Sequence, residues 1–164
     1  MIIQPSDGTF PVILLAEDHP DDVFVFRLAL QKAGLSNSLF VARDGQEAID
    51  YLGGEGPYAC RQSYPLPKLF LLDLKMPRMD GFDVLTWLKD RPEFDELPVV
   101  VLSTSSLDDD IQKAKKLGAD DYRVKPTGTE LVRLLQELHA SWLKGTDTLL
   151  KNFGRSEKPP SETA

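Results

Sequence analysis

The sequence predicts an α/β protein in which a doubly wound parallel sheet of five strands is flanked by five helices. Two observations lead to this fold class. Short apolar segments alternate along the chain with segments of helical periodicity, as successive strand–helix units require. Several apolar segments also run directly into acidic, hydroxyl or amine side chains, which is typical of strands whose carboxyl ends share one edge of an open sheet.

The composition fits one compact domain. The 164 residues are 41% hydrophobic and 27% charged, which suits a single sizeable core. The net charge of −7 argues against nucleic acid as the main partner, because binding to phosphates depends on clustered lysine and arginine. No apolar stretch approaches the roughly 20 residues of a membrane span, and residues 1–10 lack the basic start of a secretion signal. We therefore expect a cytoplasmic protein without a membrane partner.

The first strand–helix unit consists of an apolar strand, 12–16, and a helix, 21–34, that ends at a glycine. One face of this helix carries Phe24, Val25, Leu28 and Ala29. We expect Phe24 and its neighbour Phe26 to belong to the core or to a groove.

The second unit has a strand at 38–42 and a helix at 44–52. Asp44-Gly45 forms the turn between them, and the apolar positions of the helix align on one side. The following segment, 53–67, is rich in glycine, proline and polar residues and is longer than most connections of this kind. We expect it to be peripheral.

Three further units complete the sheet. Their strands are 69–72, 99–102 and 121–124, and their helices are 82–90, 108–117 and 129–143. Right-handed crossovers place helices on both faces and bring the loops after all strands to one edge. We expect the domain to span 11–143, with an N-terminal extension at 1–10 and a C-terminal tail at 144–164 that is largely disordered or forms a short docking turn.

Polar side chains follow four of the strands, and Asp73 is the most informative of them. It closes the apolar run 69–72 and precedes a loop with proline and glycine. Burying a charge costs several kcal/mol unless it is paired, so an acid at a strand tip indicates a site. The other strand ends carry Glu17 and Asp18, Ser103 and Thr104, and Lys125. We expect these groups to meet Asp73 at the common edge.

Together these motifs make the chain resemble the CheY-like, single-domain receivers of the two-component response-regulator family over about residues 11–143. The matching residues are Glu17, Asp18, Asp73 with Met76-Pro77 and Asp80-Gly81, Ser103, Tyr122 and Lys125-Pro126. Ser103 precedes Lys125 by 22 residues and Tyr122 precedes it by three, which agrees with the family. The resemblance implies a flavodoxin-like sheet with the strand order 2-1-3-4-5.

The resemblance also implies a chemistry. Asp73 would accept a phosphoryl group from a phosphohistidine of a histidine kinase, and Mg²⁺ would neutralise the acids that meet there. The metal ligands would be Glu17, Asp18, Asp73 and the backbone carbonyl of Lys75. Lys125 and Ser103 would bind the transferred phosphoryl oxygens. The protein would then catalyse only its own phosphorylation and dephosphorylation.

Family resemblance further implies a switch. Ser103 would draw the loop after the fourth strand inward, and Tyr122 would rotate toward the vacated space. The surface of the fourth helix, fifth strand and fifth helix would change; it includes Leu107, Ile111 and Trp142. Lys125-Pro126 is expected to be a cis peptide, as in the family. Thr104 stands where many receivers have alanine or glycine, and we expect its bulk to slow hydrolysis.

Partners are suggested by three features: the long loop 53–67, the Ser-Thr-Ser-Ser run at 103–106 and the Ser-Trp-Leu ending at 141–143. They resemble stand-alone receivers that are paired with bacteriophytochrome-type and related histidine kinases. A homodimer through the same switching surface is a further hypothesis, aided by the C-terminal residues Leu149, Leu150 and Phe153.

Two alternatives from other classes remain. One is a Mg²⁺-dependent phosphatase with an aspartate nucleophile, but such enzymes resemble a pattern with a second acid two residues later, where this chain has Lys75. The other is a receiver-like interaction module that is never phosphorylated, and the complete set of site residues argues against it.

Overall fold

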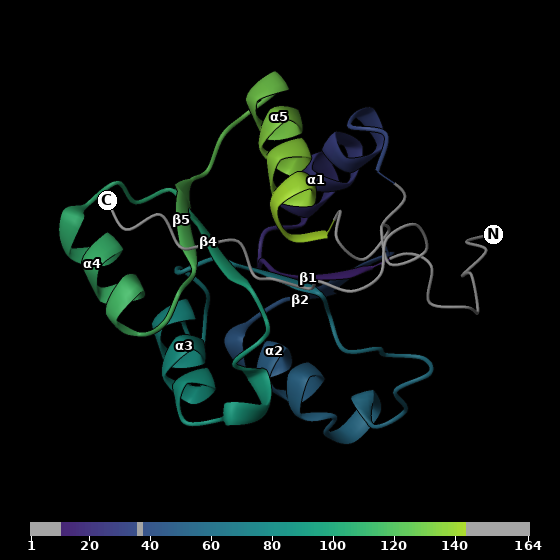
Figure 1. Cartoon of the computed structure of the whole chain (residues 1–164), viewed down its shortest axis with the longest axis vertical. Coiled ribbons are helices and arrows are strands. Elements are labelled where there is room, and N and C mark those ends of the chain that lie inside the picture. Colours follow the sequence, from purple (N-terminus) through teal and green to yellow (C-terminus); the bar gives the residue numbers. More distant parts are fainter. Residues whose placement is uncertain (1–10, 36–37, 144–164) are drawn as a thin grey trace.

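The computed structural model describes residues 11–35 and 38–143. Its five-stranded parallel sheet has the order β2-β1-β3-β4-β5, which confirms the predicted fold class and strand order (Figure 1). The strands are β1 Val12–Ala16, β2 Ser38–Ala42, β3 Leu69–Leu72, β4 Val99–Ser103 and β5 Asp121–Val124. The expected N-terminal extension, C-terminal tail and docking turn lie outside the described residues.

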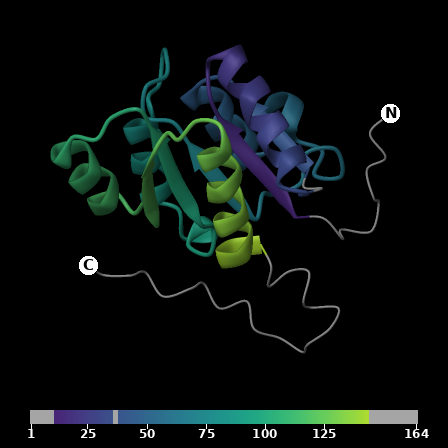
Figure 2. The ribbon, with the colours of Figure 1, turned by 90° about the horizontal axis from the view of Figure 1, so that it is seen from above.

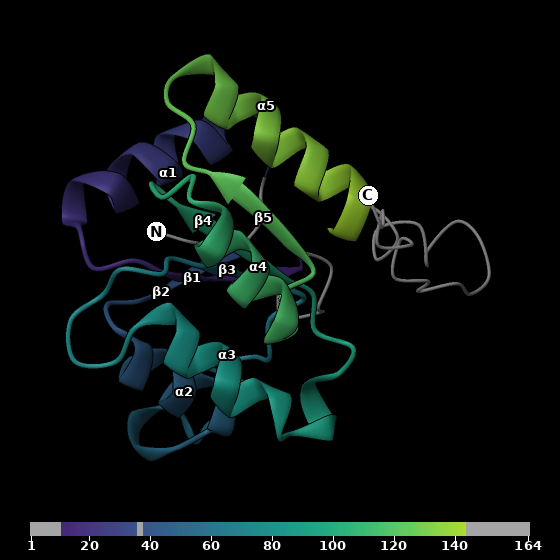
Figure 3. The same ribbon diagram turned by 90° about the vertical axis from the view of Figure 1, so that its left-hand side faces the viewer.

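Helices cover both faces of the sheet. They are α1 Pro20–Lys32, α2 Gly45–Gly53, α3 Gly81–Lys89, α4 Asp108–Lys116 and α5 Thr129–Leu138. α1 and α5 lie on one face, and α2 and α3 lie on the other (Figures 1 and 3). α4 and β5 lie at the side of the molecule away from β2 (Figure 2). Within the described ranges, no helix combines the length and the apolar composition needed to cross a membrane.

The strands divide their side chains between two apolar cores. Successive strand residues point to opposite faces, so that β1, β3 and β4 each contribute to both layers. Every residue of these three strands is buried, as expected for a parallel sheet that is covered on both sides.

The buried face of α1 differs from the predicted one. Phe26, Ala29 and Leu30 face the sheet, whereas Phe24 is 62% exposed and Val25 and Leu28 are 45% and 39% exposed. The expectation that Phe24 is a core or groove residue is therefore wrong, while that for Phe26 is correct. The helix carries two apolar stripes, and only the one spaced i, i+3, i+4 from Phe26 meets the core.

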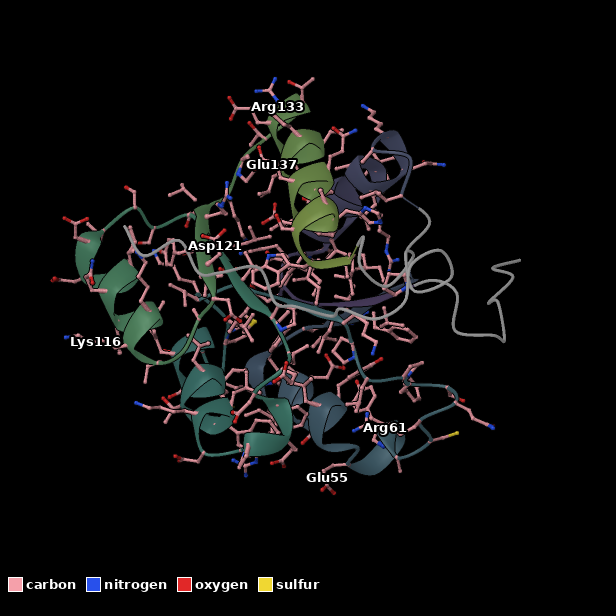
Figure 4. All side chains as sticks on the ribbon, in the orientation of Figure 1. Glu55, Arg61, Lys116, Asp121, Arg133 and Glu137 are labelled. Atoms are coloured by element: carbon pink, nitrogen blue, oxygen red, sulfur yellow. The ribbon has the colours of Figure 1, made fainter. Side chains whose placement is uncertain are left out.

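Most residues of the segment 53–67 are exposed, as expected of a peripheral connection, but several of its side chains are bound to α2. The Arg61 guanidinium donates hydrogen bonds to the carbonyl oxygens of Tyr51, Leu52 and Tyr64, at 2.8, 2.7 and 3.3 Å (Figure 4). The rings of Tyr58 and Tyr64 pack against that of Tyr51 in a tilted and an edge-on arrangement, with centroids 5.2 and 6.0 Å from its own. The segment thereby extends the core beneath α2.

The last predicted helix is interrupted. α5 ends at Leu138, and a turn of π-helix follows over His139–Leu143. Leu143 is buried and Trp142 packs against the core formed with α1. Of the other residues expected on the switching surface, Leu107 is 66% exposed and Ile111 is half-buried.

Candidate functional site

The carboxyl ends of the strands bring most of the predicted site residues together. Lys125, just after β5, extends its Nζ to 2.5 Å from Glu17 Oε2 and 3.1 Å from Asp73 Oδ2. Glu17 follows β1 and Asp73 follows β3, so this contact joins three strand ends. Glu17 is 3% exposed and Asp73 is 4% exposed. A half-buried ammonium thus binds two buried carboxylates.

The three acids form a cluster that fits a divalent cation. Glu17, Asp18 and Asp73 each offer an oxygen within 4.8 Å of the others. Asp18 Oδ1 is buried and has no hydrogen-bond partner among residues 11–35 and 38–143. A buried, unpartnered carboxylate oxygen beside two more acids is costly, and a hard cation with oxygen ligands would satisfy it. The donor set therefore fits Mg²⁺.

The charges of the site influence one another. Burial alone would lower the pKa of Lys125, but its hydrogen bond to Glu17 and the charge of Asp73 raise that pKa to about 12. The ammonium is thus charged at all physiological pH values. For Glu17, burial raises the pKa above its ordinary value in spite of the hydrogen bonds from Lys125 and from the His19 amide. The ammonium of Lys125 does not fully compensate the burial of Glu17.

A third carboxylate at Lys125 was missed by the sequence interpretation. Asp22 Oδ2, in the first turn of α1, lies 3.4 Å from Lys125 Nζ, and the Asp22 side chain is 51% exposed. Acids in a first helical turn usually complement the helix dipole, so the sequence alone gives no reason to single this one out.

The predicted switch residues are linked by hydrogen bonds along the loop after β4. Ser103 is fully buried, and its Oγ accepts a hydrogen bond from the Ser105 amide at 3.1 Å. The Tyr122 hydroxyl donates to the Ser105 carbonyl oxygen at 2.8 Å. Ser105 Oγ donates to Asp110 of α4 at 2.5 Å. This loop therefore connects Ser103 to β5 and α4. Ser105 and Asp110 were not predicted for this role.

A cavity of about 440 Å³ opens beside the site, between α1 and the start of α5. Asp73, Lys125 and Thr104 line it together with apolar residues of α1, β4 and α5. Thr104 therefore borders the approach to Asp73. Lys75 has an exposed side chain, and its amide donates to Asp73 Oδ1 at 3.3 Å. The role of its carbonyl oxygen remains a prediction.

The expectation of a cis peptide at Lys125-Pro126 is wrong. All peptide bonds in the described part of the chain are trans. The trans form is intrinsically favoured by about 0.5–1 kcal/mol even before proline, and Lys125 reaches both acids with it.

Comparison with known proteins identifies the class. The model of the response regulator receiver domain family matches residues 13–138. The response regulator Rcp1 of Synechocystis is 34% identical over 142 residues, which cover 85% of this chain and 95% of Rcp1. Its Mn²⁺-bound crystal structure superimposes with a TM-score of 0.71, over 82% of this chain and 95% of that structure.

Two further solved structures are similar. Response regulator RPA3017, from red light signalling of R. palustris, has a TM-score of 0.78 at 34% identity, over 82% of this chain and 94% of that chain. The phosphorylated cyanobacterial phytochrome response regulator RcpA has a TM-score of 0.74 at 35% identity, over 83% and 96%. The chain belongs to the response regulator receiver domain family, and its function is two-component signal transduction.

Proposed function

We propose that this protein is a phosphorylation-dependent switch of the cytoplasm, in which Asp73 accepts a phosphoryl group from the phosphohistidine of a histidine kinase. The observation that carries the proposal is the meeting of Asp73 with Lys125 and two further acids at the carboxyl edge of the sheet. Receiver relatives with known phosphorylated and Mn²⁺-bound structures support it.

The transfer follows from the contacts of Asp73. One carboxylate oxygen attacks phosphorus, the bond between phosphorus and the histidine nitrogen breaks, and the imidazole leaves with that electron pair. Lys125 already lies 3.1 Å from Asp73 Oδ2 and can follow the transferred oxygens. Glu17, Asp18, Asp73 and the Lys75 carbonyl would hold Mg²⁺. When bound, it would neutralise charge on the phosphoryl oxygens. With these groups the protein would catalyse only its own phosphorylation and dephosphorylation, and no reaction on another substrate.

The switch requires the Ser103 hydroxyl to reach the new phosphoryl group. Its oxygen now accepts from the Ser105 amide, which leaves the hydroxyl proton available for donation. Movement of Ser103 toward Asp73 would pull Ser105 and thereby strain its bonds to Tyr122 and Asp110. The surface of α4, β5 and α5 would respond, with Tyr122 as the reporting side chain.

The kinase partner would dock beside the cavity at Asp73. Phe24, Val25 and Leu28 form an exposed apolar face on α1, and Val25 lines the same cavity as Asp73 and Lys125. Such a face suits an apolar helix that carries the phosphohistidine. We propose a bacteriophytochrome-type kinase because RcpA is a phytochrome response regulator and RPA3017 acts in red light signalling.

Output would occur through protein contact, and a homodimer through α4, β5 and α5 is part of the proposal. Leu107 and Val124 are exposed on these elements, at 66% and 48%. The C-terminal residues that were expected to aid the dimer lie outside the described part of the chain. A phosphatase is not favoured, since Lys75 occupies the position of the second acid such an enzyme needs.

The test is phosphorylation by a small acyl phosphate with Mg²⁺, followed by intact-protein mass spectrometry. We expect the mass of one phosphoryl group to be added to the wild type and not to Asp73→Asn. Asp80→Asn serves as a matched control, because Asp80 is the N-cap of α3 in the same loop, outside the acid cluster. An unmodified wild type would favour the bare interaction module, and rapid turnover of phosphomonoesters would favour a phosphatase.

A further inference from the structure

The loop between β3 and α3 is fastened to the start of α2 by two contacts that phosphoryl transfer does not use. The Arg78 guanidinium pairs with the Asp44 carboxylate. One residue further on, the Met79 carbonyl oxygen accepts a hydrogen bond from the Gly45 amide at 3.0 Å. A β-carbon on Gly45 would lie 2.4 Å from that oxygen, so this close approach requires glycine.

Asp44 is an unusual anchor because it is only 3% exposed. Its Oδ1 accepts the Glu47 amide at 2.8 Å and so caps α2, and its Oδ2 accepts from Arg78. Burial would raise the pKa of Asp44, but the bonds from Glu47 and Arg78 hold that pKa below its ordinary value. A charged, buried carboxylate therefore depends on one arginine of the opposite loop.

Arg78 is conformationally unusual too. Its φ is +66°, in the left-handed region that a residue with a side chain rarely adopts. Its side chain is 77% exposed although it binds a buried acid. A strained backbone persists when surrounding contacts hold it, and here the contact is the pair with Asp44.

The fastened loop is the one that contains Lys75. Its base is closed by the Gly81 amide, which donates to the Leu74 carbonyl at 3.0 Å, and its far arm is held by Arg78 and Met79. Lys75 lies between these two fixed points, and its amide donates to Asp73 Oδ1 at 3.3 Å. The direction of the Lys75 backbone therefore depends on both fastenings.

We propose that the Asp44–Arg78 pair positions the Lys75 segment for divalent metal binding, so that the start of α2 helps to set the metal affinity of the acid cluster. This rests on the metal site proposed above at Glu17, Asp18 and Asp73. Arg78 and Asp44 are positioning residues, since neither contacts the cluster itself. Outer groups that orient ligands commonly change metal affinity by roughly tenfold or more.

The experiment is calorimetric titration of the full chain with Mg²⁺ alone, without any phosphoryl donor. Arg78→Ala and Asp44→Asn should each raise the Mg²⁺ dissociation constant roughly tenfold. Asn at position 44 retains an acceptor for the Glu47 amide, so the cap of α2 is kept. The double variant should bind Mg²⁺ no more weakly than either single variant, because both changes break the same pair. Arg78→Lys should restore part of the affinity.

Two controls separate positioning from structural support. Arg91→Ala removes another arginine, which follows α3 and contacts that helix at Trp87, and should leave the Mg²⁺ affinity unchanged. Urea unfolding of every variant measures stability independently. Unchanged affinity with lower stability would overturn the positioning role, as would additive effects in the double variant. If the wild type bound no Mg²⁺, both the proposed metal site and this inference would be wrong. If the wild type bound Mg²⁺ and the variants bound it equally well, only this inference would be wrong.

Discussion

Two regions of the molecule differ in how their buried polar groups are paired: the acid cluster at the carboxyl edge of the sheet, and residues 53–67 after α2, called here the Arg61 segment. At the edge, Glu17 and Asp73 share the Lys125 ammonium, and Asp18 Oδ1 has no partner within the described residues. After α2, one arginine satisfies three carbonyl oxygens, and the Tyr51 and Tyr58 hydroxyls each donate a hydrogen bond. In the first region one buried carboxylate oxygen has no hydrogen-bond partner among the described residues, while the polar groups named in the second region are paired with one another.

The difference teaches where stability and function are located in this fold. Three carboxylates beside one ammonium at the edge favour the binding of a cation. The hydrogen bonds and packed aromatic rings after α2 stabilise the fold. Changes at the edge should therefore alter chemistry, and changes after α2 should alter stability.

The largest effect is expected at Lys125. Lys125→Ala removes the only ammonium within hydrogen-bond distance of Asp73 among the described residues. We expect the rate of phosphorylation by a small acyl phosphate to fall by roughly 100-fold or more, as when other transition-state charge donors are removed. Stopped-flow or mass-spectrometric kinetics would measure it. Lys125→Arg keeps the charge and should retain more activity, and equal rates in both variants would contradict the assignment.

The second effect concerns stability alone. Arg61→Ala leaves the carbonyls of Tyr51, Leu52 and Tyr64 without their side-chain donor. A lost bond to a charged group costs about 1.5–3 kcal/mol, and water can replace the partly exposed Arg61 at some of the three oxygens, so we expect the free energy of unfolding to drop by about 3 kcal/mol. Urea denaturation measures this drop. The phosphorylation rate of the folded variant should match that of the wild type. A slower rate would contradict the idea that changes after α2 alter stability alone.

The two regions also differ in how far the sequence predicted them. Asp73, Glu17, Asp18 and Lys125 could be predicted because each directly follows a strand, and parallel strands bring such positions to one edge. Arg61 could not, since its partners are backbone oxygens up to ten residues away that carry no sequence signal. The same limitation applies to the Asp44–Arg78 pair, whose members lie 34 residues apart.

Surface and core were harder to distinguish on α1. Phe24 and Phe26 have the same local hydrophobicity, and only contact with β1 and α5 decides that Phe26 is buried. A helix with two apolar stripes leaves this choice to tertiary packing. The stripe that stays exposed contains Phe24 and lies close to Asp22 in the sequence. Phe24, which was predicted to be buried, is therefore part of a candidate docking surface.

A smaller effect is expected from Asp18→Asn. The substitution removes one of three crowded charges, so we expect the metal-free protein to gain about 1 kcal/mol of unfolding free energy, within the range of common stabilising changes. Added Mg²⁺ should then stabilise the wild type more than the variant, because ligand binding to the native state shifts unfolding by mass action. Thermal unfolding with and without Mg²⁺ checks both. A less stable, Mg²⁺-responsive variant would show that the cluster is not under charge repulsion.

The smallest effect is the alkaline pH dependence of the Arg61 segment. Burial, together with the hydrogen bond to Glu47, raises the pKa of Tyr58 from 10.0 to about 12. Between these values the native state retains a proton that the unfolded chain has lost, so stability decreases as pH rises from about 10 to about 12. Tyr58→Phe should lose part of this pH dependence and, at neutral pH, about 1 kcal/mol for the missing hydrogen bond. Urea midpoints from pH 8 to 12 in both proteins measure it. An identical alkaline slope would mean that other groups, such as Tyr51, whose pKa is also raised by burial, dominate the titration of this region.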